Sequence, residues 1–132
     1  MEKLFIEVQS NYNFDQTMEK LTETILMSGW KIPHVHDLQE TMQKNQFDVL
    51  PVKVLELCKP TYSVKLLERD DERIYSSLMP CRISVYNKSD GYTYVSLMNS
   101  GTMAAQLGGV VELVMTDAYL ESQKFIKSVI ID

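Results

Sequence analysis

Hydrophobic and polar residues alternate along several segments of the chain, and this period of two predicts β-strands with one covered face. The alternation runs through residues 4–9, 52–58, 81–86 and 92–97. The last two flank Asp90-Gly91, a dipeptide that favours a tight antiparallel turn, so they are predicted to form a hairpin. Residues 30–35 are predicted to form a further short strand, at a sheet edge or bulge because they contain Pro33.

A helical period follows the first strand and returns at the end of the chain. Asn13 and Gln16 form a capping pair for a helix that stops at Gly29. After Gly101 the pattern predicts helix to the end of the chain, with Gly108-Gly109 separating a short lead-in helix from the long final one. Several polar residues of that helix are expected to face solvent: Glu112, Asp117, Glu121, Lys124 and Lys127.

Two shorter helices and one charged stretch complete the pattern. Asp37 and Glu40 form a second capping pair, which opens a helix through about Lys44. Pro60 suits the first turn of another helix, because its missing N–H costs nothing there. Residues 68–73 mix acidic and basic side chains, and predict either a solvated connection or a docking loop.

The order of elements predicts one α+β domain over residues 1–132. A hairpin gives antiparallel pairing, and each helix has one face of the sheet to cover. The expected architecture is a curved antiparallel sheet packed against the two longer helices, with short extra helices. A chain of 132 residues has the size of a single domain and can bury a core without disulfides.

Composition and charge narrow the classes of function. The formal net charge of −5 disfavours broad nucleic-acid binding, because an acidic surface repels phosphate. No apolar run approaches the roughly 20 residues that a membrane span needs. The N-terminal segment lacks the apolar core of a signal peptide, so we expect a cytoplasmic protein whose two cysteines are reduced.

Both cysteines stand beside a proline at a predicted strand boundary, in two distinctive phrases. These are Leu57-Cys58-Lys59-Pro60 and Leu78-Met79-Pro80-Cys81-Arg82. The chain also contains Phe14-Asp15-Gln16-Thr17 at a predicted helix start, Ser28-Gly29-Trp30 at a predicted helix end, and Asp37. Together with the two phrases, these residues make the chain similar to the bacterial and archaeal family called domain of unknown function 302. The similarity covers most of the chain; one departure is Lys59, where that family commonly has Asn.

That resemblance implies a fold and an assembly, and no activity. It implies an α+β fold like that of the TATA-box-binding protein and a tendency towards homodimers. It names no reaction, and the fold label says nothing of DNA binding, since one fold hosts unrelated functions.

Cys58 and Cys81 leave three interpretations open. Their spacing fits neither a C-x-x-C redox motif nor a zinc ribbon. They are small core side chains, a redox pair, or two soft ligands for a metal. Arg82 is a candidate for binding a carboxylate or phosphate, or for lowering a thiol pKa, but alternation along a strand places it on the face opposite Cys81.

His34 and His36 lie on one face of a predicted strand, where paired imidazoles can share a metal. With the cysteines they make a Cys58, Cys81, His34 and His36 set suited to zinc. The alternative is that both histidines are solvated. Asp37 either orients one of them or caps the next helix.

We therefore expect a non-catalytic module that binds a small molecule or another protein, and that acts as a homodimer. The chain contains no nucleophile elbow, phosphate loop or calcium loop. Candidate ligand-binding residues are Cys58, Cys81, Arg82 and His36, and the sequence leaves the identity of any cofactor unknown. The alternative is a thiol- or metal-dependent protein centred on Cys58 and Cys81.

Overall fold

In the computed structural model, which describes residues 3–130, five antiparallel strands form one sheet in the order β1-β5-β4-β3-β2. The strands are β1 (Phe5–Gln9), β2 (Lys31–Asp37), β3 (Val52–Cys58), β4 (Cys81–Asn87) and β5 (Thr93–Met98). The helices are α1 (Phe14–Met27), α2 (Leu38–Lys44), α3 (Pro60–Leu67), η1 (Glu72–Leu78, a 3₁₀ helix), α4 (Ser100–Ala104) and α5 (Gly109–Lys127). The prediction of an α+β fold with an antiparallel sheet is confirmed.

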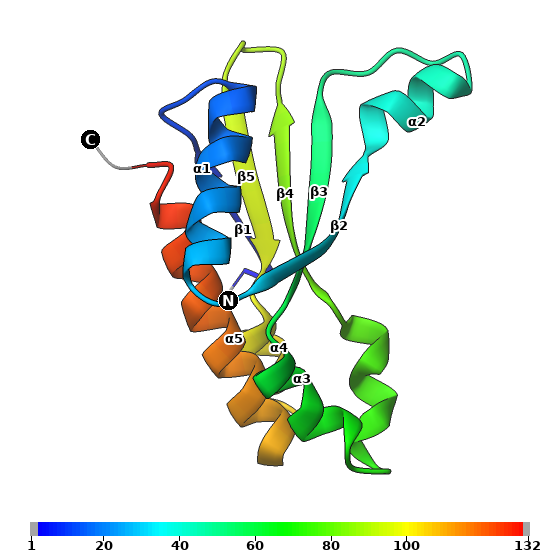
Figure 1. The fold of residues 1–132 in the computed structure, drawn as a ribbon, viewed down its shortest axis with the longest axis vertical. Helices are drawn as coiled ribbons and strands as arrows, with labels where there is room; N and C mark the ends of the chain where they lie inside the picture. The colour runs from blue at the N-terminus through cyan, green and yellow to red at the C-terminus, as the bar shows by residue number, and fades with distance from the viewer. Residues whose placement is uncertain (1–2, 131–132) are drawn as a thin grey trace.

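The two longest helices, α1 and α5, lie side by side against one face of a strongly twisted sheet (Figure 1). Residues 21 and 25 of α1 and residue 125 of α5 are fully or almost fully buried against strand residues such as Leu55 and Val85. The opposite face of the sheet carries the alternate side chains of each strand. Alternation along β3, β4 and β5 therefore decides which side chains enter the core and which lie on this free face.

The helices begin and end with the capping residues that the sequence predicts. Asn13 and Gln16 make a complete capping box at the start of α1, and Gly29 follows this helix at a φ of +83°. Asp37 Oδ1 accepts a hydrogen bond from the Glu40 amide at 2.9 Å, so Asp37 is the cap of α2. Pro60 occupies the first turn of α3.

One prediction about the helices is wrong, and one needs a small correction. The final helix ends at Lys127, because the Val129 carbonyl turns back to accept a hydrogen bond from the Asn11 amide at 2.8 Å. The predicted helical end at residues 131 and 132 lies outside the described residues. The charged stretch at residues 68–73 is a connection over residues 68–71, as expected, because these form an exposed turn; its last two residues begin η1 at Glu72.

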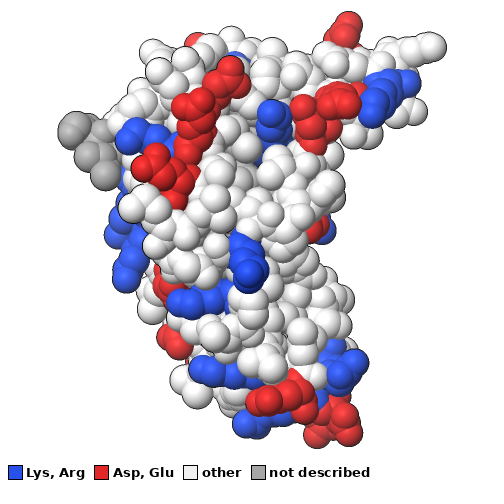
Figure 2. All heavy atoms as spheres, in the orientation of Figure 1, with Lys and Arg blue, Asp and Glu red and all other residues white. Residues whose placement is uncertain are grey.

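Charged side chains are interspersed over the described residues of the face on which α1 and α5 lie (Figure 2). Basic and acidic groups are intermixed there, with uncharged surface between many of them, and they form no broad basic patch on the described part of this face. Phosphate binding uses a basic patch or stripe, so this face lends no support to nucleic-acid binding. Within residues 3–130, no helix has the length and apolar character that a membrane crossing needs.

Candidate functional site: a methionine-rich cavity beside Cys81

The two cysteine-containing phrases meet at one end of the sheet. Strands β3 and β4 are antiparallel neighbours, and Leu57 lies opposite Cys81 in their register. The end of β3 and the start of β4 are therefore adjacent, as the sequence predicts.

The two cysteines have different surroundings at this end. Cys81 packs against the main core, whereas Cys58, next to Leu57, belongs to the alternate set of β3 side chains. The Cys58 Sγ lies 3.7 Å from the Ser63 hydroxyl of α3. Burial, and then the nearby Cys58, raise the pKa of the Cys81 thiol, so the protonated form is favoured at neutral pH.

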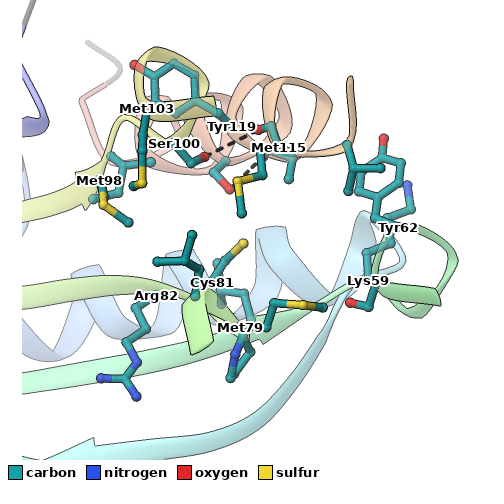
Figure 3. A pocket seen from close by; sticks show the side chains of 18 of the residues that line it. Lys59, Tyr62, Met79, Cys81, Arg82, Met98, Ser100, Met103, Met115 and Tyr119 are labelled. Carbon is teal, nitrogen blue, oxygen red and sulfur yellow. Dashed lines mark hydrogen bonds between the residues drawn. The ribbon is translucent and has the colours of Figure 1, made fainter. Parts of the chain in front are cut away.

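Arg82 lies on the opposite face from Cys81, as alternation predicts. Its side chain is 63% exposed, and its Nη2 lies 3.6 Å from Glu56 Oε2. The guanidinium points away from the Cys81 thiol (Figure 3). Arg82 is therefore not placed to lower the pKa of that thiol by direct contact.

The histidines share the free face with Arg82. The rings of His34 and His36 lie edge to face, with centroids 4.3 Å apart. His36 Nε2 donates to Glu56 Oε2 at 2.8 Å, and this hydrogen bond is the main reason why the Glu56 pKa is lowered. The Asp37 carboxylate caps α2 by accepting the hydrogen bond from the Glu40 amide.

The four predicted metal ligands do not gather at one point. Over residues 3–130, no group of three or more His, Cys, Asp or Glu side chains is arranged to hold a metal ion. Cys81 lies on the core side, while the rings of His34 and His36 contact one another on the free face of the edge strand β2. The Cys58, Cys81, His34 and His36 set therefore stays a prediction for which the structure offers no common site.

A cavity of about 500 Å³ opens at the end of the sheet where β4 begins and β5 ends. Leu57, Cys81 and Leu97 line it from the core side, and Ser84 and Ser96 line it from the free face. Its other walls come from α3, η1, α4 and α5. The cavity is mostly apolar, which is typical of small-molecule sites.

Sulfur-containing side chains supply much of this apolar lining. Met103 and Met115 approach from α4 and α5, while Cys81 points towards them from the start of β4 (Figure 3). Met79 and Met98 line the same space. Because methionine has three rotatable bonds and a polarisable sulfur, such a lining adapts to differently shaped apolar ligands.

A cluster of polar side chains forms one border of the cavity, and its centre is Glu121 of α5. Trp30 Nε1 donates to Glu121 Oε1 at 2.9 Å, the Tyr62 hydroxyl donates to Oε2, and Lys59 Nζ lies 3.3 Å from Oε1. The three donor residues, Trp30, Lys59 and Tyr62, line the cavity, whereas Glu121 itself lines a second hollow.

The expectation that Glu121 faces solvent is wrong, because three donors from distant segments enclose it and leave its side chain 22% exposed. Burial acts to raise the Glu121 pKa, but the hydrogen bonds from Trp30, Tyr62 and Lys59 outweigh it and the net shift is downward. The same carboxylate raises the pKa of Tyr62 to about 12. The helical periodicity of this segment in the sequence gives no hint of this role.

The fold and the cavity place the chain in a class of α+β proteins in which a twisted antiparallel sheet and C-terminal helices line an apolar pocket. The model of the family "Domain of unknown function DUF302" matches residues 6–129, so the chain belongs to that family. No curated protein matches the chain. A crystal structure of an uncharacterized conserved DUF302 protein from Bacillus stearothermophilus superposes with a TM-score of 0.86 at 17% identity, covering 97% of this chain and 99% of that one. At that identity the likeness establishes the fold alone.

Proposed function

We propose that the protein is a non-catalytic module that binds a small, mostly apolar molecule in the cavity beside Cys81. The observation that carries this proposal is the convergence of both distinctive phrases on one space. Leu57 and Lys59 of the first phrase line the cavity, and so do all five residues 78–82 of the second. A volume of about 500 Å³ lies within the usual range for small-molecule sites, about 300–1,000 Å³.

The state of Cys81 favours binding over thiol chemistry. The nucleophilic form of cysteine is the thiolate, and burial raises the pKa of this thiol above its ordinary value of 9.0. A protonated, partly buried thiol behaves as a small apolar group. Cys81 therefore fits the wall of an apolar site better than the centre of a redox reaction.

Titration with N-phenyl-1-naphthylamine, an uncharged fluorophore that brightens in apolar surroundings, tests the proposal. We expect saturable binding by the wild type and at least a tenfold loss of affinity in Met103→Trp, where the larger ring fills the cavity. Met27→Trp is the matched control, because Met27 is 80% exposed at the end of α1 and does not line the cavity. Non-saturable fluorescence, or equal binding by both variants, would count against the site.

We also propose that the protein acts as a homodimer through the outer face of α5. Leu113 and Leu120 lie seven residues apart, about two helical turns, and are 68% and 51% exposed. Exposed apolar side chains on one stripe of a helix are a feature of interaction surfaces. Light scattering at micromolar concentration should return twice the chain mass of 15.2 kDa.

The double variant Leu113→Glu/Leu120→Glu should return the mass of a single chain with an unchanged circular dichroism spectrum. Leu50→Glu is the control, because Leu50 is also 50% exposed but lies between α2 and β3. A wild type that is already monomeric would contradict the dimer.

We propose a cytoplasmic location as well, on the basis of the thiols. Cys58 ends β3, Cys81 begins the adjacent strand β4, and both thiols are free. Unpaired thiols persist in a reducing compartment. Acid-quenched alkylation of cells that contain the protein should find both reduced; a substantial oxidised fraction would argue for another compartment.

A further inference from the structure

Charge is distributed unevenly around the cavity. Lys59 and Arg82 are both among its lining residues. Over the part of the chain that the structure describes, no Asp or Glu lines it, although acidic residues outnumber basic ones by 18 to 13 in the sequence. An apolar cavity with cations on its wall and no carboxylate is complementary to a ligand that combines an apolar body with a negative charge.

The two cations differ in how firmly they are held. Lys59 Nζ lies 3.3 Å from Glu121 and 4.9 Å from the centre of the Tyr62 ring, so it is engaged inside the protein. Arg82 Nη2 lies 3.6 Å from Glu56, and that carboxylate makes its closer contact, 2.8 Å, with His36. Arg82 is therefore the cation that a ligand can recruit at little cost.

The position of Arg82 suits a charged group better than the cavity interior does. Its side chain is 63% exposed and extends outward from the start of β4, while Cys81 points inward (Figure 3). Ser84 and Ser96 lie opposite one another in the sheet register, on the same free face, and both line the cavity. Burying an isolated charge is costly, so an anion is expected at this hydrated rim.

We propose that the ligand is an amphiphile whose apolar body occupies the methionine-lined cavity and whose anionic group, such as a carboxylate, binds to Arg82 at the rim. The inference rests on the proposed function, because it names the class of ligand for the same cavity. The planar guanidinium presents paired N–H donors that match a carboxylate, and the hydroxyl group of Ser84 on the same face adds a further donor.

The test uses decanoate and 1-decanol, which share an apolar chain and differ in charge, as competitors of bound N-phenyl-1-naphthylamine. We expect the wild type to bind decanoate at least tenfold more tightly than decanol at pH 7.5 and low salt. Arg82→Gln should weaken decanoate binding at least tenfold and leave decanol binding within twofold, and Arg82→Lys should lie between. Arg73→Gln is the control, because Arg73 lies on η1, donates to the Leu67 carbonyl and does not line the cavity.

The outcomes separate the two proposals. Equal affinity for decanoate and decanol, or an equal effect of Arg82→Gln on both, overturns the assignment of an anionic ligand while the apolar site stands. A loss in Arg73→Gln as large as that in Arg82→Gln also overturns it, because net charge alone would then explain the effect. If the fluorophore and both competitors fail to bind, the proposed function itself fails, and the inference with it.

Discussion

The indole Nε1 of Trp30 donates a hydrogen bond to the carboxylate of Glu121 at 2.9 Å, across 91 residues of sequence. This contact joins the residue before β2 to the middle of α5. The Trp30 ring also meets Phe125 edge to face, with centroids 5.4 Å apart, and Tyr62 at 6.0 Å. One carboxylate thus fixes the positions of an edge strand, the start of α3 and the final helix around the cavity.

Glu121→Ala is expected to lower the free energy of unfolding by about 2 kcal/mol or more, because it leaves three donors without their acceptor and hydrogen bonds to a charged group are among the stronger ones. Urea unfolding at pH 7 measures this. Glu19→Gln is the control, since it removes an exposed carboxylate from the middle of α1. Equal unfolding midpoints for the two variants would show that the cluster contributes nothing.

The Glu121→Gln variant tests how the stability due to the same contact depends on pH. The pKa of Glu121 is lower in the folded protein than its ordinary value of 4.5, so the folded state binds fewer protons near that pH. The stability due to this carboxylate is present above pH 4.5 and is lost as the pH falls through the lowered pKa. The difference in unfolding free energy between wild type and Glu121→Gln should therefore shrink below pH 4.5. A difference that stays constant down to pH 3 would contradict this origin.

The Cys81 thiol is expected to react slowly with Ellman's reagent in Cys58→Ser, where it is the only thiol. Burial raises its pKa above 9.0, so the fraction of thiolate is small at neutral pH and the rate should still increase above pH 9. A saturating apolar ligand should slow the reaction further, because Cys81 lines the cavity. The same variant unfolded in urea is the control, and folded protein that reacts equally fast would revive the thiol-dependent alternative.

Asp37→Ala should accelerate hydrogen exchange of the Glu40 amide about fivefold, the change expected for the loss of a helix cap worth about 1 kcal/mol. Asp37→Asn should exchange nearly as the wild type does, because asparagine also accepts a hydrogen bond at this position. Nuclear magnetic resonance measures both rates. Equal rates in the alanine and asparagine variants would show that the cap does not control the start of α2.

Features set by neighbouring residues could be predicted from the sequence. The Asn13–Gln16 box, the Asp37 cap and the hairpin at Asp90-Gly91 each depend on atoms a few positions apart, and Gly91 has the positive φ, +87°, that the turn requires. The opposite orientations of Cys81 and Arg82 followed from alternation in the same way.

Features set by distant residues could not be predicted. Helical periodicity predicts that Glu121 faces solvent on an amphipathic helix. It does not predict that the Tyr62 hydroxyl, 59 residues away in the sequence, donates a hydrogen bond to this carboxylate. The cavity also depends on residues that are distant in the sequence, because its walls come from β3, β4, β5 and the segments that follow them. Its volume depends on how closely these elements approach, and no local pattern encodes that.

Glu56→Gln is expected to tighten decanoate binding, because Glu56 is the carboxylate nearest to Arg82 and competes with the ligand for the guanidinium. Exposed ion pairs contribute about 0.2–1 kcal/mol, so the gain should be about 1.4- to fivefold, and it should disappear at high salt. Decanol binding should not change, since no charge is involved. Glu68→Gln, in the turn after α3, is the control for net charge. The double variant Glu56→Gln/Arg82→Gln should show no gain over Arg82→Gln alone, because the effect acts through the guanidinium; a gain that persists without Arg82 would mean that the anion binds elsewhere.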